Sequence, residues 1–193
     1  MSKVHSLGAD VTFGQGVVLQ GLTLSSATTQ VQLPDQSDTV FKVKQGDFLV
    51  DLRVVTTGGH LYVRLPFSQF TEATPDEARA VPNLAQLLDA TSGLPALLAT
   101  GTGTRYLGTE QVAGVDTDKI ATTYTASQVG QLLGGDVRPA GDVQATIWVG
   151  TSDHYVRRVL LSGPLLEAGK NVQVQVDLHD FNKPVNITNP TTG

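Results

Sequence analysis

The feature that most constrains this chain is an alternation of apolar and polar residues with a period of two, repeated along most of its length. Apolar side chains occupy every second position of each stretch, as in Val50, Leu52 and Val54. This period is typical of β-strands with one face against a core and the other toward solvent. Turn-forming residues at 45–47 and 58–59 separate consecutive stretches. The pattern therefore predicts a meandering antiparallel sheet of about ten strands.

The middle of the chain changes to apolar residues spaced three and four apart, which predicts short helices. One helix opens at Pro82 and includes Leu87 and Leu88. Residues 92–93 end it, and a second short helix follows with Pro95 in its first turn. Ahead of them, residues 67–81 show neither period. Loops of this length often act as lids or binding loops, so we expect this segment to form the rim of a site.

A third short helix is expected over residues 126–133, with Thr125 or Ser127 as its N-cap and the glycines at 134–135 as its end. Strand-like alternation then resumes. No repeat, low-complexity block or change of composition divides the chain, so we expect a single domain over residues 1–193. The fold class predicted from these elements is α+β.

The predicted strands carry more apolar surface than three short helices can cover. Such a sheet either packs around a filled core or curves around an apolar cavity that a ligand occupies. Periodicity alone favours the filled core, because spacing along a sequence does not measure volume.

Composition and charge exclude several classes of function. With 13 basic and 18 acidic residues and a pI near 5.2, the chain lacks the basic excess of nucleic-acid-binding proteins. It has no cysteine, which excludes disulfides, thiol nucleophiles and cysteine-based zinc sites. No apolar run approaches the ~20 residues that cross a bilayer as a helix.

No catalytic or metal-binding pattern stands out. The four histidines lie on separate segments, without the i, i+4 pairs of helical metal sites. The densest group is Asp177, His179 and Asp180, but Asp177 and His179 are expected on the solvent side of a strand whose other side is apolar. Residues 101–104 lack the Lys-Ser/Thr ending of a phosphate-binding loop and are expected to form a flexible connector, and residues 116–118 a turn. We therefore expect neither an enzyme nor a cofactor or metal site.

Three pieces of the sequence, in a fixed order along nearly the whole chain, carry a resemblance to a known family. The first runs from Gly-His-Leu-Tyr at 59–62, through Leu-Pro at 65–66 and Leu-Leu-Asp at 87–89, to Ser-Gly-Leu-Pro-Ala-Leu-Leu-Ala at 92–99. The second has glycines at 108 and 114, isoleucine at 120, and alanine and valine at 126 and 129. The third is Val-Gln-Ala-Thr-Ile-Trp-Val at 143–149, followed by His154 and Arg158. Together they resemble the LppX/LprA/LprF/LprG lipoproteins of the mycobacterial and related actinobacterial cell envelope.

The resemblance implies a fold of the LolA/LolB type: a strongly curved antiparallel half-barrel sheet, with short helices packed in its concave face and an apolar cavity between them. It implies a non-catalytic carrier that holds the acyl chains of di- or triacylated lipids or glycolipids and moves or presents them across the envelope. The family departs from this chain at position 144, where it often has proline and this chain has Gln144.

The resemblance also implies an exported lipoprotein, anchored to the cell membrane through an N-terminal lipid and facing the periplasm or cell wall, with an export partner in the envelope. The signal peptide, the lipidated cysteine and the helix that usually precedes the first strand are missing from the sequence. We therefore expect the anchor and first helix to have been truncated, which leaves a soluble chain.

We expect apolar side chains to form the wall of the lipid site, although each would equally suit a filled core. From the strands we select Phe41, Val43, Phe48, Val50, Leu52, Val54, Leu61, Val63, Ile147, Val149 and Val174. From the helices we select Leu87, Leu88, Leu94, Leu97 and Leu98. Phe67 and Phe70 are expected at the entrance, where they would shield the chains below a polar headgroup.

Two other classes of function stay open. One is a structural or signalling module of the envelope, with a filled core and a protein partner bound at an exposed strand edge. The other is a lipid-acting hydrolase, which is disfavoured because no nucleophile–base pair can be named in the sequence.

Overall fold

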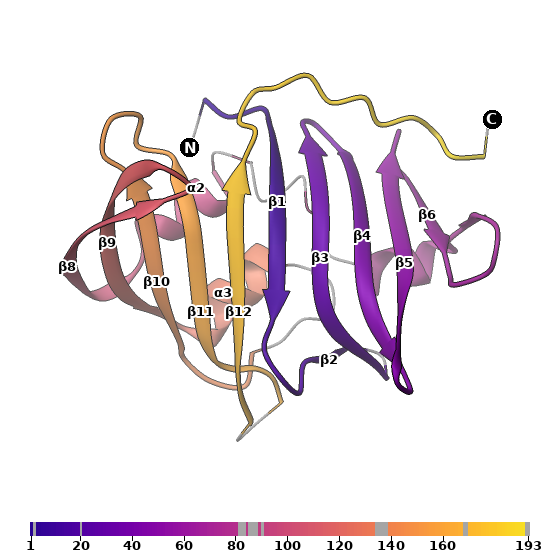
Figure 1. The fold of residues 1–193 in the computed structure, drawn as a ribbon, viewed down its shortest axis with the longest axis horizontal. Coiled ribbons are helices and arrows are strands. Elements are labelled where there is room, and N and C mark those ends of the chain that lie inside the picture. The colour runs from indigo at the N-terminus through magenta and orange to yellow at the C-terminus, as the bar shows by residue number, and fades with distance from the viewer. Residues whose placement is uncertain are drawn as a thin grey trace.

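The structure is a computed structural model that describes residues 1–193 except 2, 20, 81–83, 85–88, 90, 134–138, 168–169 and 192–193. Its described part contains one large sheet and short helices (Figure 1). The strands are β1 (Ser6–Phe13), β2 (Val18–Leu19), β3 (Leu22–Gln32), β4 (Gln36–Gln45), β5 (Phe48–Thr57), β6 (His60–Arg64), β7 (Thr71–Glu72), β8 (Thr102–Val112), β9 (Val115–Tyr124), β10 (Val143–Gly150), β11 (Val156–Glu167) and β12 (Lys170–His179). The helices are α1 (Pro75–Ala80), α2 (Leu94–Leu98) and α3 (Ala126–Leu133).

The strands form a single 12-stranded sheet in the order β7-β6-β5-β4-β3-β1-β12-β11-β10-β9-β8, with β2 paired to β3. Neighbouring strands run antiparallel, and β1 lies between β3 and β12, so the two ends of the chain meet in the middle of the sheet. The path ends at β7 and β8, which leaves the sheet open. These features confirm the predicted antiparallel α+β fold. The sheet has more strands than expected because β2 and β7 are two residues long, too short to show a period.

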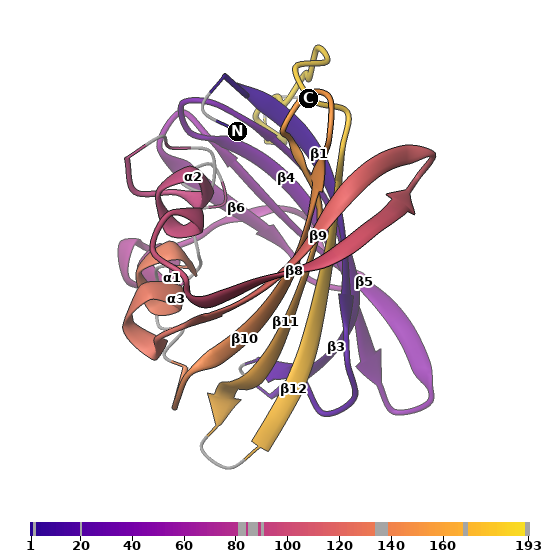
Figure 2. The same ribbon diagram turned by 90° about the vertical axis from the view of Figure 1, so that its left-hand side faces the viewer.

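Irregular pairing bends the sheet at several strands. The register shifts between Tyr106 and Gly108 in β8, and again after Gly163 in β11. Gly108 has φ +112°, a conformation that side chains with a Cβ rarely adopt. A Cβ at Gly163 would lie 3.0 Å from the Asp142 carbonyl oxygen. Such bulges kink a strand and increase its twist, which accounts for the strong curvature visible in Figure 2.

All three helices lie on one side of the curved sheet (Figure 2). We call the face of the sheet toward them the concave face, and the opposite face the convex face. The residue that caps α3 is Thr125, one of the two predicted candidates. Its N–H donates to Gln128 Oε1 (2.7 Å), and Gln128 N–H donates to Thr125 Oγ1 (3.3 Å), which is a capping box. Helix α2 has Gly93 as its N-cap. Pro95 lies in its first turn, as predicted.

Residues 67–81, expected to be a loop, contain β7 and α1 instead. Helix α1 starts with a capping box, in which Thr74 N–H and hydroxyl donate to Glu77 Oε2, each at 2.8 Å. These hydrogen bonds lower the pKa of Glu77, with the backbone N–H as the largest cause. Periodicity missed α1 because its sequence Pro-Asp-Glu-Ala-Arg-Ala has no apolar stripe. The start of α1 does have a local signal, because residues 74–77, Thr-Pro-Asp-Glu, are typical of a helix N-terminus.

Two further expectations about local structure are corrected. Residues 102–104 are part of β8 rather than a connector, with Gly103 at φ +62° where the pairing with β9 is irregular. Residues 116–118 are part of β9 rather than a turn; Thr117 is buried, and its hydroxyl donates to the Glu110 carbonyl. The helix expected around Leu87 and Leu88 falls largely outside the described residues.

Buried apolar side chains gather in three clusters. The largest, which we call the main cluster, connects both halves of the sheet to α2 and α3. The second surrounds Leu7 and Val31 and shares Leu178 with the main cluster. The third joins Val55 and Tyr62 to Ile187 of the segment after β12, which runs along one end of the sheet in Figure 1. In the described part of the chain, no helix has the length and apolar character needed to cross a membrane.

Candidate functional site

The concave face carries an unbroken apolar row across most of the sheet. Strand pairing aligns one residue from each of β9, β10, β11, β12, β1, β3, β4 and β5. In that order they are Ile120, Ile147, Val159, Val176, Val11, Ala27, Phe41 and Leu52. All are buried or half-buried. The row presents no charged or hydrogen-bonding side chain, so it suits a ligand that is itself apolar.

The main cluster lies between this face and the helices. Val129 of α3 is buried in it, and Leu94, Leu97 and Leu98 of α2 pack against it as half-buried residues. Nine of the side chains selected from the sequence come together here. They are Phe41, Val43, Val50, Leu94, Leu97, Leu98, Ile147, Val149 and Val174.

Four more selected residues lie beside this cluster on the same face. Val54 pairs with Val63, and Leu52 pairs with Phe41 of the apolar row. Val54 and Leu61 are buried, whereas Leu52 and Val63 are half-buried. This part of the concave face extends the apolar surface toward the β6 end of the sheet.

Three selected aromatic residues do not join the concave group. Phe48 is 75% exposed at the turn between β4 and β5, and Phe67 is 98% exposed, with φ +61°. Phe70 packs on the third cluster, on the convex face, with the guanidinium carbons of Arg53 and Arg64 5.7 and 5.1 Å from its ring centre. Leu87 and Leu88, the last two selected residues, lie outside the described residues.

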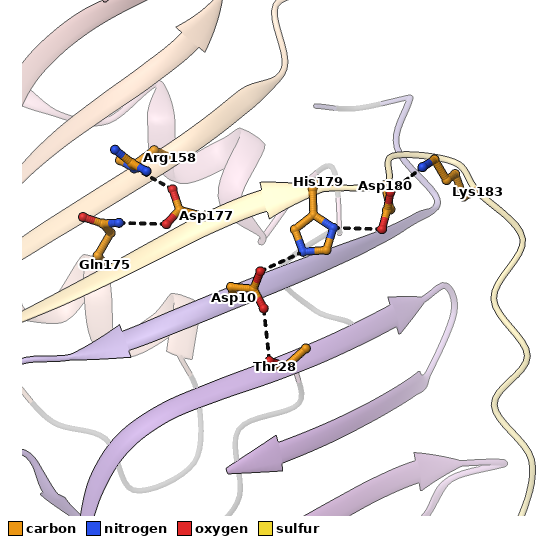
Figure 3. A network of polar contacts seen from close by, with 8 residues as sticks. All are labelled: Asp10, Thr28, Arg158, Gln175, Asp177, His179, Asp180 and Lys183. Carbon is orange, nitrogen blue, oxygen red and sulfur yellow. Dashed lines mark hydrogen bonds and ion pairs between the residues drawn. The ribbon is translucent and has the colours of Figure 1, made fainter. Parts of the chain in front are cut away.

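The convex face of the central strands is polar, as expected for Asp177 and His179 (Figure 3). Asp177 accepts hydrogen bonds from Arg158 Nε at 2.5 Å and from Gln175 Nε2 at 2.7 Å. The side chains of Asp177 and His179 are both partly exposed. The group lies across the sheet from the main cluster, so it takes no part in the apolar site.

His179 is the centre of a second set of contacts on that face. Its Nδ1 lies 2.9 Å from Asp180 Oδ2, and its Nε2 lies 3.3 Å from Asp10 Oδ2. Lys183 Nζ also contacts Asp180, and this hydrogen bond is the largest cause of the lowered pKa of the Asp180 carboxyl. No group of three or more potential ligands that could hold a metal ion occurs among the described residues. We interpret the contacts of Asp177 and His179 as a polar network on the surface, and we call it the polar network.

Sequence reasoning missed several residues of the main cluster, among them Tyr124 at the end of β9. Tyr124 is 2% exposed, and its hydroxyl has no hydrogen-bond partner among the described residues. Burial raises the pKa of this phenol above its ordinary value. The sequence does contain a signal for the buried position of Tyr124: it is every second residue from Ile120 and Thr122, so the three share one face of the strand.

Comparison with known proteins finds that this chain is similar to lipoproteins. The sequence model of the LppX_LprAFG lipoprotein family matches residues 1–187. The lipoarabinomannan carrier protein LprG of Mycobacteroides abscessus is 26% identical over 141 residues, which cover 73% of this chain and 59% of that protein. The LprG of Mycobacterium tuberculosis is 27% identical over 150 residues, covering 77% and 60%. The chain thus spans less than two thirds of the length of these relatives.

Solved structures share the fold. LprF from Mycobacterium bovis aligns with a TM-score of 0.76 at 20% identity, covering 98% of this chain and 90% of that one. The lipoprotein LppX from Mycobacterium tuberculosis aligns with a TM-score of 0.66 at 24% identity, covering 96% and 91%. At these identities the likeness concerns the backbone architecture alone.

Proposed function

This chain belongs to the LppX_LprAFG lipoprotein family, and from that membership we propose that it is a carrier that holds the acyl chains of lipids or glycolipids on its concave face. Its relatives are named as carriers and lipoproteins rather than enzymes, in agreement with the prediction of a non-catalytic protein. The name lipoarabinomannan carrier protein, borne by LprG, supports a glycolipid as the cargo. We further propose that the protein is exported, is anchored to the cell membrane, and moves or presents its lipid across the envelope with an export partner.

One observation carries the proposal: the row of paired residues on the concave face stays apolar across eight strands. An acyl chain needs contact area rather than hydrogen bonds, because burying each CH₂ group contributes about 0.8 kcal/mol. A chain lying across this row would gain that energy along its whole length. The row therefore supports binding of acyl chains of varied length.

Helices α2 and α3, which pack against the main cluster, are short. Helix α2 has 5 residues and α3 has 8, whereas isolated helices shorter than roughly 12 residues are marginal in water. Both therefore depend on packing against the main cluster for their stability. We expect a bound acyl chain to contact the same cluster and so to compete with the helices for it.

We propose that the wall consists of the selected residues that lie on the concave face. These are Phe41, Val43, Val50, Leu52, Val54, Leu61, Val63, Leu94, Leu97, Leu98, Ile147, Val149 and Val174. Phe67, whose ring is almost fully in water, stays a proposal for the entrance, where a bound lipid would cover it. Phe48 is left out of the wall because its side chain is 75% exposed, and Phe70 is left out of the entrance because it packs on the third cluster, on the convex face.

Bulky substitutions on the two faces of one strand pair test the wall. Phe41→Trp and Val50→Trp add volume on the concave face, whereas Val40→Trp adds it on the convex face of β4, next to Phe41 in sequence. We expect the two concave variants to bind a fluorescent long-chain fatty acid roughly tenfold more weakly, and Val40→Trp to bind it as the wild type does. The melting temperature of each variant shows whether the fold is intact. Equal affinity of all variants would contradict the wall, as would equal weakening by Val40→Trp.

A structural or signalling module is the second candidate function, and β8 is the observation that favours it. This strand is an edge of the sheet, and Tyr106 and Leu107 on it are 63% and 50% exposed. The hairpin of β8 and β9 projects from the body of the molecule in Figure 2. Such an edge suits pairing with a strand of another protein. This alternative assumes a filled core, which would bind no lipid, so the fatty-acid titration separates the two functions.

A further inference from the structure

The hydroxyl of Tyr124 is an isolated polar group in an apolar environment. Tyr124 is 2% exposed and belongs to the main cluster, and its Oη has no hydrogen-bond partner among the described residues. The buried threonine hydroxyls of the sheet are paired: Thr29 with Thr39 at 2.7 Å, and Thr122 with Thr104 at 3.1 Å. Among the described residues, Tyr124 Oη is one of four buried side-chain polar atoms without a hydrogen-bond partner, with Trp148 Nε1, Arg157 Nε and His179 Nε2, and it is the only hydroxyl of the four.

Leaving a buried hydroxyl unpaired destabilises a protein by about 1–3 kcal/mol. Phenylalanine has the same ring and would avoid that cost at position 124. Burial also keeps the phenol protonated, so that it remains a hydrogen-bond donor. A donor retained in an apolar cluster points to an acceptor that arrives from outside the chain.

The position of Tyr124 agrees with an acceptor from a ligand. It pairs with Val143 of β10, and Val129 of α3 belongs to the same cluster, so the ring lies where sheet and helix meet. The next residue, Thr125, uses its N–H and hydroxyl within the α3 capping box. Both groups are therefore used by the cap and do not satisfy the phenol, which stays without a partner among the apolar side chains that the proposed lipid would contact.

We propose that the Tyr124 hydroxyl donates a hydrogen bond to the ester carbonyl of a bound acyl chain, so that the protein selects ester-linked over ether-linked lipids. This inference rests on the proposed function. An ester carbonyl is a neutral acceptor attached directly to an apolar chain, and one donor satisfies it. A phosphate or sugar brings charge or many hydroxyls, and a single phenol in an apolar cluster does not satisfy those groups.

Paired ligands that differ only in their two ester carbonyls test the inference. The probes are dipalmitoyl phosphatidylglycerol and its di-O-hexadecyl ether analogue, each titrated into lipid-free protein. We expect the wild type to bind the ester about tenfold more tightly than the ether. Tyr124→Phe should bind both with the affinity of the ether, while its melting temperature without lipid stays equal to or above that of the wild type.

Tyr62→Phe is the matched control. Tyr62 is 4% exposed on the convex face, and its Oη accepts a hydrogen bond from Asn189 Nδ2 at 2.8 Å. Removing that hydroxyl should lower the melting temperature and leave the ester preference unchanged. A wild type without ester preference, or a Tyr124→Phe variant that keeps it, overturns the inference while lipid binding stands. If the wild type binds neither probe, the proposed function fails with it.

Discussion

Single residues next to each other on a strand have opposite roles in this protein. Val54 lies on the concave face as part of the proposed wall, whereas Val55 packs against Tyr62 and Ile187 on the convex face. Leu178 packs on the main cluster, and its neighbour His179 belongs to the polar network. Because neighbouring residues of a strand point to opposite faces, a substitution affects either the proposed lipid site on the concave face or the convex surface.

The polar network yields a prediction about acid stability. The charged form of Asp180 is favoured in the folded protein, which lowers its pKa. Its contribution to stability is present above the unfolded pKa, about 3.9, and is lost as pH falls through the lowered folded value. Asp180→Asn should thus lower the free energy of unfolding at pH 7, and the gap to the wild type should close in strong acid. Urea denaturation at pH 7, 4 and 2 measures this.

Asp47→Asn, in the exposed turn between β4 and β5, is the matched substitution for that series. It makes the same change of charge away from the network and should leave the stability difference from the wild type near zero at each pH. If the difference in free energy of unfolding between the wild type and Asp180→Asn stays constant from pH 7 to 2, the charge of the Asp180 carboxylate does not contribute to stability.

At the scale of elements, local signals located most strands and two of the helices. Alternation identified β5 and β10, and the segment of α3 was predicted at its observed bounds of Ala126–Leu133. Elements without an apolar pattern, such as β7 and α1, were missed because their residues are mostly exposed and leave no period to detect. An element with an apolar pattern of its own can thus be predicted from its local sequence. An element without such a pattern is harder to predict, because contacts with distant parts of the chain stabilise it.

The capping box of α3 provides a prediction at this scale. Thr125→Ala removes the hydroxyl that accepts from Gln128 N–H, which should destabilise the protein by about 1 kcal/mol. Ser127→Ala, the other cap considered from the sequence, changes an exposed residue inside the helix and should change stability by less than about 0.5 kcal/mol. Urea denaturation of both variants measures the difference. Equal losses would contradict the assignment of Thr125 as the N-cap.

At the scale of the whole molecule, the arrangement of the sheet decides which apolar residues meet. The pairing of β1 with β12 joins residues more than 160 positions apart, such as Val11 and Val176, and so completes the apolar row. Local sequence contains no signal for such pairing. Phe70 shows the consequence, because its side chain is as apolar as Phe41 but packs on the convex face. Fold class was therefore predictable from sequence, and membership of the wall only in part.

The central claim is that the concave face carries acyl chains, and native mass spectrometry tests it most directly. The protein is expressed in a mycobacterial host, purified without detergent and transferred gently to the gas phase. We predict a species heavier than the chain by the mass of an acylated lipid, with that mass lost on denaturation and identified as acyl lipid in the extract. A protein that appears only at its own mass under these conditions would contradict the account and favour a filled core.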